Sequence, residues 1–222
     1  KFKYPRNGVT LSRALKYDNI KYGIVVVPVR NRKDNLDYTL QSFKNVLDHT
    51  PEFYGKKPNE CIEVVVVEHD KKPNHQKMVE GKGFSYIHIK SSDKFNKSLC
   101  MNTAYLKLKD KLDTKGHFIF HDVDLLPNDS MIEHYANIYG SDDVVHLAAG
   151  WRRYGANPNY IGGVTLFGRD IFGAINGFPN TYWGWGGEDD ELLRRLRTIS
   201  YPIEERLQKI RVEDPFIDLE GV

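Results

Sequence analysis

Two short segments of the 222-residue chain carry acidic side chains in patterns that are typical of metal binding or proton transfer. Asp122 and Asp124 stand two positions apart and follow the apolar residues 118–120 after one histidine, His121. If the strand geometry of that run persists, both carboxylates face one side, where they can hold a hard divalent cation and leave positions open for substrate oxygens. The competing interpretation is a pair of solvated loop aspartates ahead of a helix. The apolar run directly before the pair favours a functional site.

The second segment, residues 183–191, reads WGWGGEDDE. A glycine-rich loop that leads into a helix accounts for the acids, because the helix dipole favours negative charge in the first turn. It does not account for Trp183 and Trp185, two large aromatics separated by a single glycine. Such rings can form a flat platform for a sugar ring while nearby carboxylates bind its hydroxyls. A carboxylate beside the platform can also take the proton of an attacking hydroxyl.

Alternating strands and helices must position these two segments. Apolar runs predict strands at residues 22–29, 61–68, 84–89, 118–120, 144–148 and 160–167. Apolar spacing predicts helices over 36–47, 95–106 and 188–197. This order predicts an α/β fold with a mostly parallel central sheet and helices on both faces. In such sheets, ligands bind at the carboxyl ends of the strands.

The composition of the chain narrows the class of function. Thirty-two basic and 30 acidic residues give a net charge of +2, which argues against nucleic acid as a partner. Cys61 and Cys100 form no Cys-x-x-Cys motif, which excludes zinc ribbons and disulfide frameworks. Two free thiols, no signal peptide and no apolar run near the ~20 residues of a membrane segment predict a cytoplasmic protein. If an anchor has been removed ahead of Lys1, the Golgi lumen is expected instead.

Four segments resemble the β-1,4-galactosyltransferase family. They are PVRNR at 28–32, FNKSLCMN at 95–102, FHDVDLLP at 120–127 and YIGGVTLFGRDIFGAINGFPNTYWGWGGEDDEL at 160–192. They follow the family's order, with similar spacings, across residues 22–200.

The resemblance implies one glycosyltransferase domain with a GT-A-type, Rossmann-like fold. A lead-in at 1–21 would precede a nucleotide-binding half at 22–130 and an acceptor-binding half at 131–222. The implied cofactor is Mn²⁺ or Mg²⁺. The implied reaction is inverting transfer of a hexose, galactose from UDP-galactose, to a hydroxyl of a carbohydrate or glycoconjugate acceptor.

The resemblance also assigns roles to individual positions. Contacts to the nucleotide sugar are implied for Pro28, Arg30, Arg32, Phe95, Lys97, Asp122, Val123, Tyr160 and Gly187. Lys97 stands where the family commonly has an arginine, which keeps the charge and loses the bidentate geometry. At the position of Tyr160, tyrosine accompanies galactose and smaller residues admit N-acetylgalactosamine. Ile161 beside it replaces a usual phenylalanine.

The remaining roles fall on the tryptophan-rich segment. The resemblance implies that Asp189 is the general base, that Glu188 binds the donor sugar and that Trp185 is a mobile indole covering donor and acceptor. Acceptor contacts are implied for Trp185, Asp190 and Tyr182.

Asp124 matches the family's first metal ligand, but the rest of that metal site has no counterpart. Family members supply Met and His from a downstream Met-x-x-His stretch, whereas this chain has no His after His146 and no Met after Met131. Alignment without gaps places Asp214 opposite that His, so Asp214 or Glu213 can donate an oxygen instead. A ligand beyond this sequence, or weak metal binding, are the other interpretations.

Three other functions are compatible with these residues. The same fold can use UDP-N-acetylgalactosamine or UDP-glucose as donor. A non-catalytic relative can keep the aromatic platform and bind carbohydrate alone. A glycosidase with paired carboxylates is the third, and it would leave the PVRNR segment without a purpose.

Overall fold

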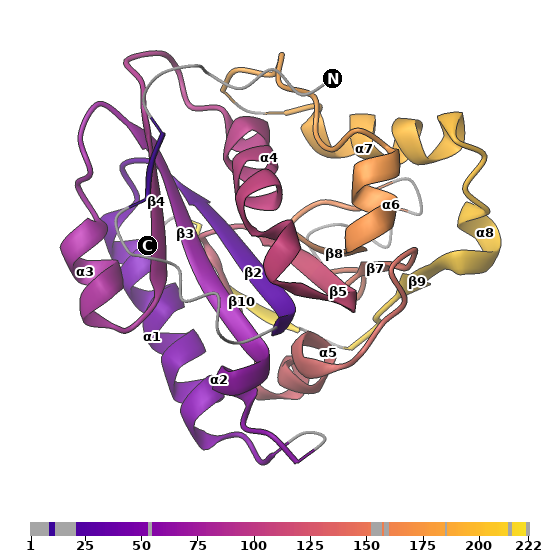
Figure 1. The fold of residues 1–222 in the computed structure, drawn as a ribbon, viewed down its shortest axis with the longest axis horizontal. Coiled ribbons are helices and arrows are strands. Elements are labelled where there is room, and N and C mark those ends of the chain that lie inside the picture. The colour runs from indigo at the N-terminus through magenta and orange to yellow at the C-terminus, as the bar shows by residue number, and fades with distance from the viewer. Residues whose placement is uncertain are drawn as a thin grey trace.

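The structure of the protein is a computed structural model that describes residues 9–11, 21–52, 55–151, 157, 160–184, 186–212 and 215–220. Within these residues, eight strands form one sheet in the order β1-β4-β3-β2-β5-β8-β7-β9 (Figure 1). The bounds are β1 (Val9–Leu11), β4 (Ser85–Lys90), β3 (Ile62–Asp70), β2 (Lys21–Val29), β5 (Leu112–His121), β8 (Val164–Gly168), β7 (Val144–His146) and β9 (Leu207–Lys209).

The centre of the sheet is parallel and buried on both faces. β3 pairs in parallel with β2 and β4, and β2 pairs in parallel with β5. β1, β8 and β7 join antiparallel to β4, β5 and β8, and β9 runs parallel to β7. Ile24, Val25, Val26 and Val27 each have 0% exposure, as expected for a strand covered on both sides. The predicted mostly parallel central sheet is confirmed.

Helices cover both faces of the sheet, as predicted (Figure 1). The helical elements are α1 (Lys33–His49), α2 (Pro58–Cys61), α3 (Gln76–Gly81), α4 (Lys97–Leu108), η1 (Lys109–Lys111), η2 (Asp129–Met131), α5 (Ile132–Ala136), α6 (Arg169–Ala174), α7 (Glu188–Thr198) and α8 (Ile203–Arg206). Apolar residues of α4, α6 and α7 pack in one core cluster, and those of α1 pack in the other.

Alternate side chains of β2 serve these two clusters. Ile24 and Val26 belong to the cluster that contains α4, whereas Val25 and Val27 belong to the cluster that contains α1. This alternation follows from the two-residue repeat of a strand. It places the end of β2 between both layers of helices.

A second, two-stranded sheet joins distant parts of the chain. β6 (Leu125–Pro127) pairs antiparallel with β10 (Phe216–Asp218), and Asp218 lies opposite Leu125. The next residue, Leu219, donates its backbone N–H to the oxygen of Asp124 at 2.8 Å. The described carboxyl-terminal segment therefore lies beside the acidic pair after β5.

Several predicted boundaries differ from the structure. β1 lies inside the predicted lead-in and extends the sheet through its pairing with β4. Phe95 precedes α4, because Asn96 caps the helix by accepting a hydrogen bond from the N–H of Leu99. The strand predicted at 160–167 begins only at Val164. The strand β10 has no counterpart among the predicted elements.

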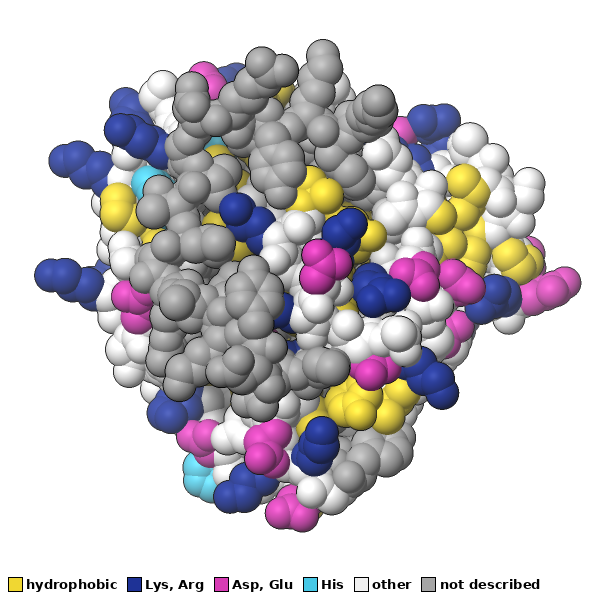
Figure 2. Space-filling view, in the orientation of Figure 1, with side chains coloured by type: hydrophobic (Ala, Val, Ile, Leu, Met, Phe, Trp, Pro, Cys, Tyr) yellow, Lys and Arg dark blue, Asp and Glu magenta, His cyan; other side chains and the backbone are white. Residues whose placement is uncertain are grey.

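The surface carries both signs of charge. Figure 2 shows lysine and arginine side chains interspersed with aspartate and glutamate across this face, as the near balance of 32 basic and 30 acidic residues indicates. Among the described residues, no helix is long and apolar enough to cross a membrane.

Two buried histidines on β5 predict acid sensitivity. Burial lowers the pKa of His117 and of His121 from 6.5 to about 4, so both stay neutral in the folded protein where the unfolded chain binds protons. We therefore expect the free energy of unfolding to fall as pH drops from about 6.5 toward 4. Urea denaturation followed by circular dichroism measures this slope. His117→Asn should reduce it and the exposed control His49→Asn should keep it; an unchanged slope in His117→Asn would contradict the assignment.

Candidate active site

Two adjoining cavities lie at the carboxyl ends of β2 and β5, where α/β sheets bind ligands. The first, which we call the arginine cavity, has a volume of about 140 Å³ and is lined by Pro28, Val29, Arg30, Asn31, Arg32, Phe95, Lys97, Asp122, Val123, Asp124, Gly184 and Glu188. The second, the acidic cavity, has a volume of about 340 Å³ and is lined by Lys97, Asp122, Asp124, Leu125, Trp151, Tyr160, Gly186, Gly187, Glu188, Asp189, Asp190 and Glu220. Lys97, Asp122, Asp124 and Glu188 line both.

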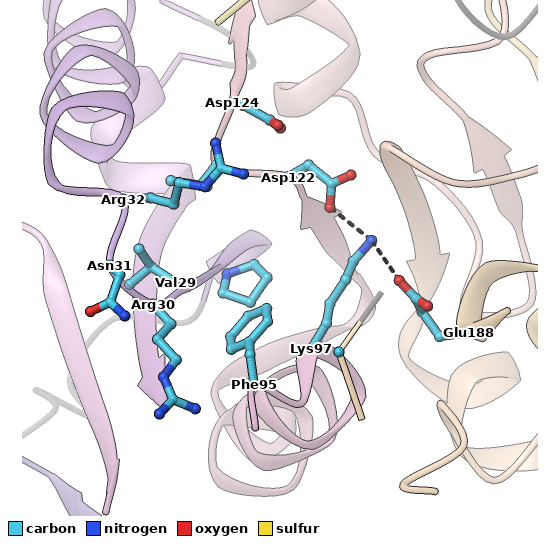
Figure 3. A pocket seen from close by; sticks show the side chains of 12 residues that line it. Val29, Arg30, Asn31, Arg32, Phe95, Lys97, Asp122, Asp124 and Glu188 are labelled. Carbon is cyan, nitrogen blue, oxygen red and sulfur yellow. Dashed lines mark ion pairs between the residues drawn. The ribbon is translucent and has the colours of Figure 1, made fainter. Parts of the chain in front are cut away.

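The turn after β2 builds one wall of the arginine cavity. Asn31 has a left-handed φ of 54°, a conformation that Asn adopts more readily than most residues. Figure 3 shows the guanidinium of Arg32 toward Asp124, whereas that of Arg30 points away from the acidic pair. Arg30 also donates a hydrogen bond to the backbone oxygen of Asp93. Arg32 is therefore the arginine that faces the acids.

Lys97 joins the acids of the two cavities. Its Nζ lies 2.8 Å from Asp122 and 3.6 Å from Glu188 (Figure 3). It also lies 3.5 Å from Asp189. Burial lowers the pKa of Lys97, but the attraction of Asp122, Asp189 and Glu188 outweighs burial and raises the pKa well above its ordinary value. The ammonium is therefore held charged in a buried position.

The acidic pair is only partly compensated by positive charge. Burial raises the pKa of Asp122 to about 6, although Lys97 opposes this shift. Asp124 is 9% exposed. Burial raises the pKa of Asp124, Arg32 opposes the shift, and the negative charges of Asp218 and Glu220 add to it. A cation at Asp124 would relieve this repulsion.

Three glycines shape the loop that carries the tryptophans. Gly184, Gly186 and Gly187 have φ values of +93°, +100° and +87°, which only glycine adopts without strain. At Gly187, a Cβ would also lie 2.5 Å from the ring of Tyr182. The three glycines line the cavities, whereas Tyr182 does not.

Trp183 lies away from the two cavities. Its side chain is 47% exposed, its ring centroid is 6.2 Å from that of His69, and it lines neither cavity. Trp185 is outside the described residues. The platform of paired indoles therefore stays a prediction.

The acidic residues in the amino-terminal turn of α7 have two roles: lining the acidic cavity and pairing with arginines of the same helix. Glu188, Asp189 and Asp190 line the acidic cavity. Glu191 instead accepts hydrogen bonds from Arg194 at 2.6 Å and from Arg195 at 3.2 Å. Three acids of this turn therefore serve the site, and the fourth forms ion pairs along its own helix.

Gly162 lies close to two side chains that line the acidic cavity, Asp189 and Tyr160. A Cβ at this position would lie 2.3 Å from Asp189 Oδ2 and 2.3 Å from the hydroxyl of Tyr160. These separations are far below van der Waals contact. The absence of a side chain at Gly162 therefore leaves room for both Asp189 and Tyr160 beside it.

Gly162→Ala is expected to displace Asp189 and Tyr160 and to lower the catalytic activity of the site by about 100-fold, since a shift of about 1 Å in a site can cost that much. Steady-state kinetics measures the loss. The control is Gly81→Ala, because a Cβ at Gly81 would meet nothing within 4 Å. Equal activity in Gly162→Ala and the wild type would show that this close approach has no catalytic importance.

The structure brings most of the predicted site residues together. Pro28, Arg30, Arg32, Phe95, Lys97, Asp122 and Val123 line the arginine cavity, and Asp124, Tyr160, Gly187, Glu188, Asp189 and Asp190 line the acidic cavity. Tyr182, predicted to contact the acceptor, supports Gly187 from outside. Trp185 and Asp214 lie outside the described residues.

Sequence reasoning missed Trp151 and Glu220, which line the acidic cavity. Trp151 is 6% exposed and lines the cavity, yet it belongs to no motif. Glu220 reaches the cavity through the pairing of β10 with β6. No local spacing signals that long-range contact.

The residues around Asp124 fit a divalent cation that has only part of its shell from the protein. Among the described residues, no group of three or more His, Cys, Asp and Glu side chains can hold a metal ion. Asp124 and Glu220 both line the acidic cavity. Two carboxylates suit a hard cation that takes its other ligands from water and substrate phosphates.

Comparisons with known proteins point to one family. A family model described as the N-terminal domain of galactosyltransferase matches residues 143–214. β-1,4-Galactosyltransferase 4 from Rattus norvegicus is 34% identical over 199 residues, which cover 88% of this chain and 45% of the relative. The human β-1,4-galactosyltransferase 4 is 33% identical over 195 residues, with 86% and 44% covered. The chain spans about half the length of the curated relatives it matches.

Solved structures share the fold at lower identity. A mutant of Drosophila β-1,4-galactosyltransferase 7, in complex with manganese, UDP-Gal and xylobiose, has a TM-score of 0.62 and 21% identity, with 91% of this chain and 72% of that chain covered. A mannosyltransferase from Pyrobaculum calidifontis, in complex with GDP-Man and Mn²⁺, has a TM-score of 0.61 and 16% identity, with 95% and 60% covered.

The sheet, the two layers of helices and these neighbours define a GT-A-type glycosyltransferase fold. Within that class, the chain is a relative of the β-1,4-galactosyltransferases, as its four sequence segments predicted.

Proposed function

We propose that this chain is a metal-dependent inverting glycosyltransferase that transfers a hexose, galactose from UDP-galactose, to a hydroxyl of a carbohydrate acceptor. The observation that carries the proposal is that the arginine cavity and the acidic cavity adjoin and share Asp122, Asp124 and Glu188. The arginine cavity offers the cations that bind a diphosphate. The acidic cavity offers carboxylates that can bind sugar hydroxyls and accept a proton. The names of the relatives and the ligands of the Drosophila complex support the donor.

The nucleotide would lie in the arginine cavity. Phe95 offers an aromatic ring to the nucleobase, and Arg32 and Lys97 offer cations to the diphosphate. Arg30 contributes positive charge from the same turn as Arg32, with its guanidinium pointing away from the acidic pair (Figure 3). This cavity therefore supplies the positioning of the donor.

Asp124 and Glu220 would hold Mn²⁺ or Mg²⁺, since both line the acidic cavity beside the diphosphate position. The bound cation supplies positive charge that stabilises the leaving diphosphate. Glu220 is a second carboxylate in this proposal, and Asp214, outside the described residues, stays the ligand that alignment predicts.

Asp189 would accept the proton of the acceptor hydroxyl as that oxygen attacks C1 of the donor from the face opposite the diphosphate. The new C–O bond forms as the C1–O bond to UDP breaks, so the anomeric configuration inverts. Glu188 would bind the donor sugar, and Asp190 would bind the acceptor; both line the acidic cavity. A cavity closed to water would protect the donor from hydrolysis.

A panel of UDP-sugars, assayed with Mn²⁺, Mg²⁺ and several mono- and disaccharide acceptors, tests the proposal. We expect UDP release that depends on metal and acceptor and is fastest with UDP-galactose. Faster turnover of UDP-N-acetylgalactosamine or UDP-glucose would change the donor. Carbohydrate binding without UDP release under any condition would make the chain a binding protein, and release of sugar from a glycoside without nucleotide would make it a glycosidase.

A further inference from the structure

One lysine contacts acids that belong to different steps of the proposed reaction. The ammonium of Lys97 is paired with Asp122 on the nucleotide side and with Asp189, the proposed base. We propose that Lys97 is a donor-sensitive latch, which neutralises Asp189 until a diphosphate in the arginine cavity draws the ammonium away. This inference rests on the proposed function and adds a regulation of its base.

The contacts suit an exchange of partners. Asp122 lies 2.8 Å from Nζ, at hydrogen-bond distance, whereas Asp189 lies 3.5 Å and Glu188 3.6 Å away. The lysine side chain is 10% exposed, so water screens these pairs little. An ammonium on a four-carbon stem has three donors that reorient by rotation. The two looser pairs, with Asp189 and Glu188, are therefore the ones that a new anion can replace.

The backbone that carries Lys97 is anchored. Asn96 caps α4 and donates a hydrogen bond to the oxygen of Asn180 at 2.9 Å. Asn102 donates to the oxygen of Phe178 at 2.8 Å. These bonds tie the start of α4 to the segment ahead of the glycine loop. The latch is therefore expected to move by rotation of the Lys97 side chain, with the helix in place.

A diphosphate would enter directly beside the latch. Lys97 lines both cavities, and Asp189 lines only the acidic one. Charge-assisted hydrogen bonds to phosphate oxygens compete well with a carboxylate at ion-pair distance. Once the ammonium turns toward the diphosphate, Asp189 loses its cation and is available to the acceptor hydroxyl. Donor binding thereby activates the base, and the base stays neutralised when the donor is absent.

A thermodynamic cycle tests the latch without any acceptor. UDP binding is measured by calorimetry, at fixed Mg²⁺, for the wild type, Asp189→Asn, Lys97→Met and the double variant. In the presence of Lys97, Asp189→Asn should tighten UDP binding about fivefold or more, because a competitor for the ammonium is gone. In the Lys97→Met background, the same substitution should change the affinity by less than about twofold.

Direct repulsion between Asp189 and the diphosphate would give the same tightening in both backgrounds, and that result overturns the latch. Asp190→Asn is the matched control, since it removes a neighbouring charge in the same cavity. If Lys97→Met does not fold or does not bind UDP, Lys97→Gln takes its place in the cycle. Equal effects of Asp189→Asn and Asp190→Asn on UDP binding reject the proposal, because the ion pair with Lys97 belongs to Asp189.

The cycle separates this inference from the proposed function. The expected coupling with no sugar transfer would keep the latch and reject the transferase. Transfer with additive affinities would keep the transferase and reject the latch.

Discussion

Asp189→Asn is expected to slow sugar transfer severely while the protein still binds UDP at least as tightly as the wild type. Asparagine keeps the size of the side chain but cannot accept the proton of the acceptor hydroxyl. General-base catalysis typically contributes 10²- to 10⁴-fold, so kcat should fall by about that factor. UDP release under saturating donor and acceptor measures the loss, and calorimetry measures UDP binding.

Asp170→Asn is the control for this substitution. Asp170 is exposed at the start of α6 and pairs with Arg169, so its loss should leave kcat unchanged. Transfer at the wild-type rate by Asp189→Asn would show that the base lies elsewhere. Equal loss in both variants would indicate a general effect on the fold.

Asp124→Asn is expected to weaken the binding of Mn²⁺, measured in the presence of UDP, by about tenfold or more. Even residues that only support a metal ligand commonly contribute 10- to 100-fold. Glu220→Gln should weaken binding in the same direction, because both carboxylates line one cavity. Paramagnetic resonance of free Mn²⁺ gives the affinity directly, whether or not the variants retain activity.

Two further variants make the metal experiment decisive. Glu205→Gln changes an exposed residue of α8 and should bind Mn²⁺ as the wild type does. Asp214→Asn tests the ligand that alignment predicted. If Asp214→Asn loses Mn²⁺ and Glu220→Gln does not, the assignment of Glu220 is wrong and that of Asp214 stands.

The parts of the site that were predictable are those encoded by local sequence. Asp122 and Asp124 follow a buried strand, so their position at the end of β5 follows from the apolar run alone. The glycines at 184, 186 and 187 predict a loop whose backbone other residues adopt only with strain, and all three have positive φ. Helix α7 begins at Glu188, where the acids favour a helix start.

The parts that were not predictable depend on distant contacts. Glu220 enters the acidic cavity only because β10 pairs with β6, and a three-residue strand leaves little signal in composition. Lys97 was assigned to phosphate by resemblance. Its pairs with Glu188 and Asp189 arise from the packing of α4 beside the glycine loop, which no single segment specifies.

The alternation along β2 has a consequence for how the molecule would respond to its donor. Lys97 begins a helix on the layer that packs on Val26, and Arg32 precedes a helix on the layer that packs on Val25. A diphosphate that contacts both cations would bridge the front and the back of the sandwich. Part of its binding energy would then hold the two helix layers in fixed relative positions. The layers would therefore fluctuate more in the protein without donor than in the complex with donor.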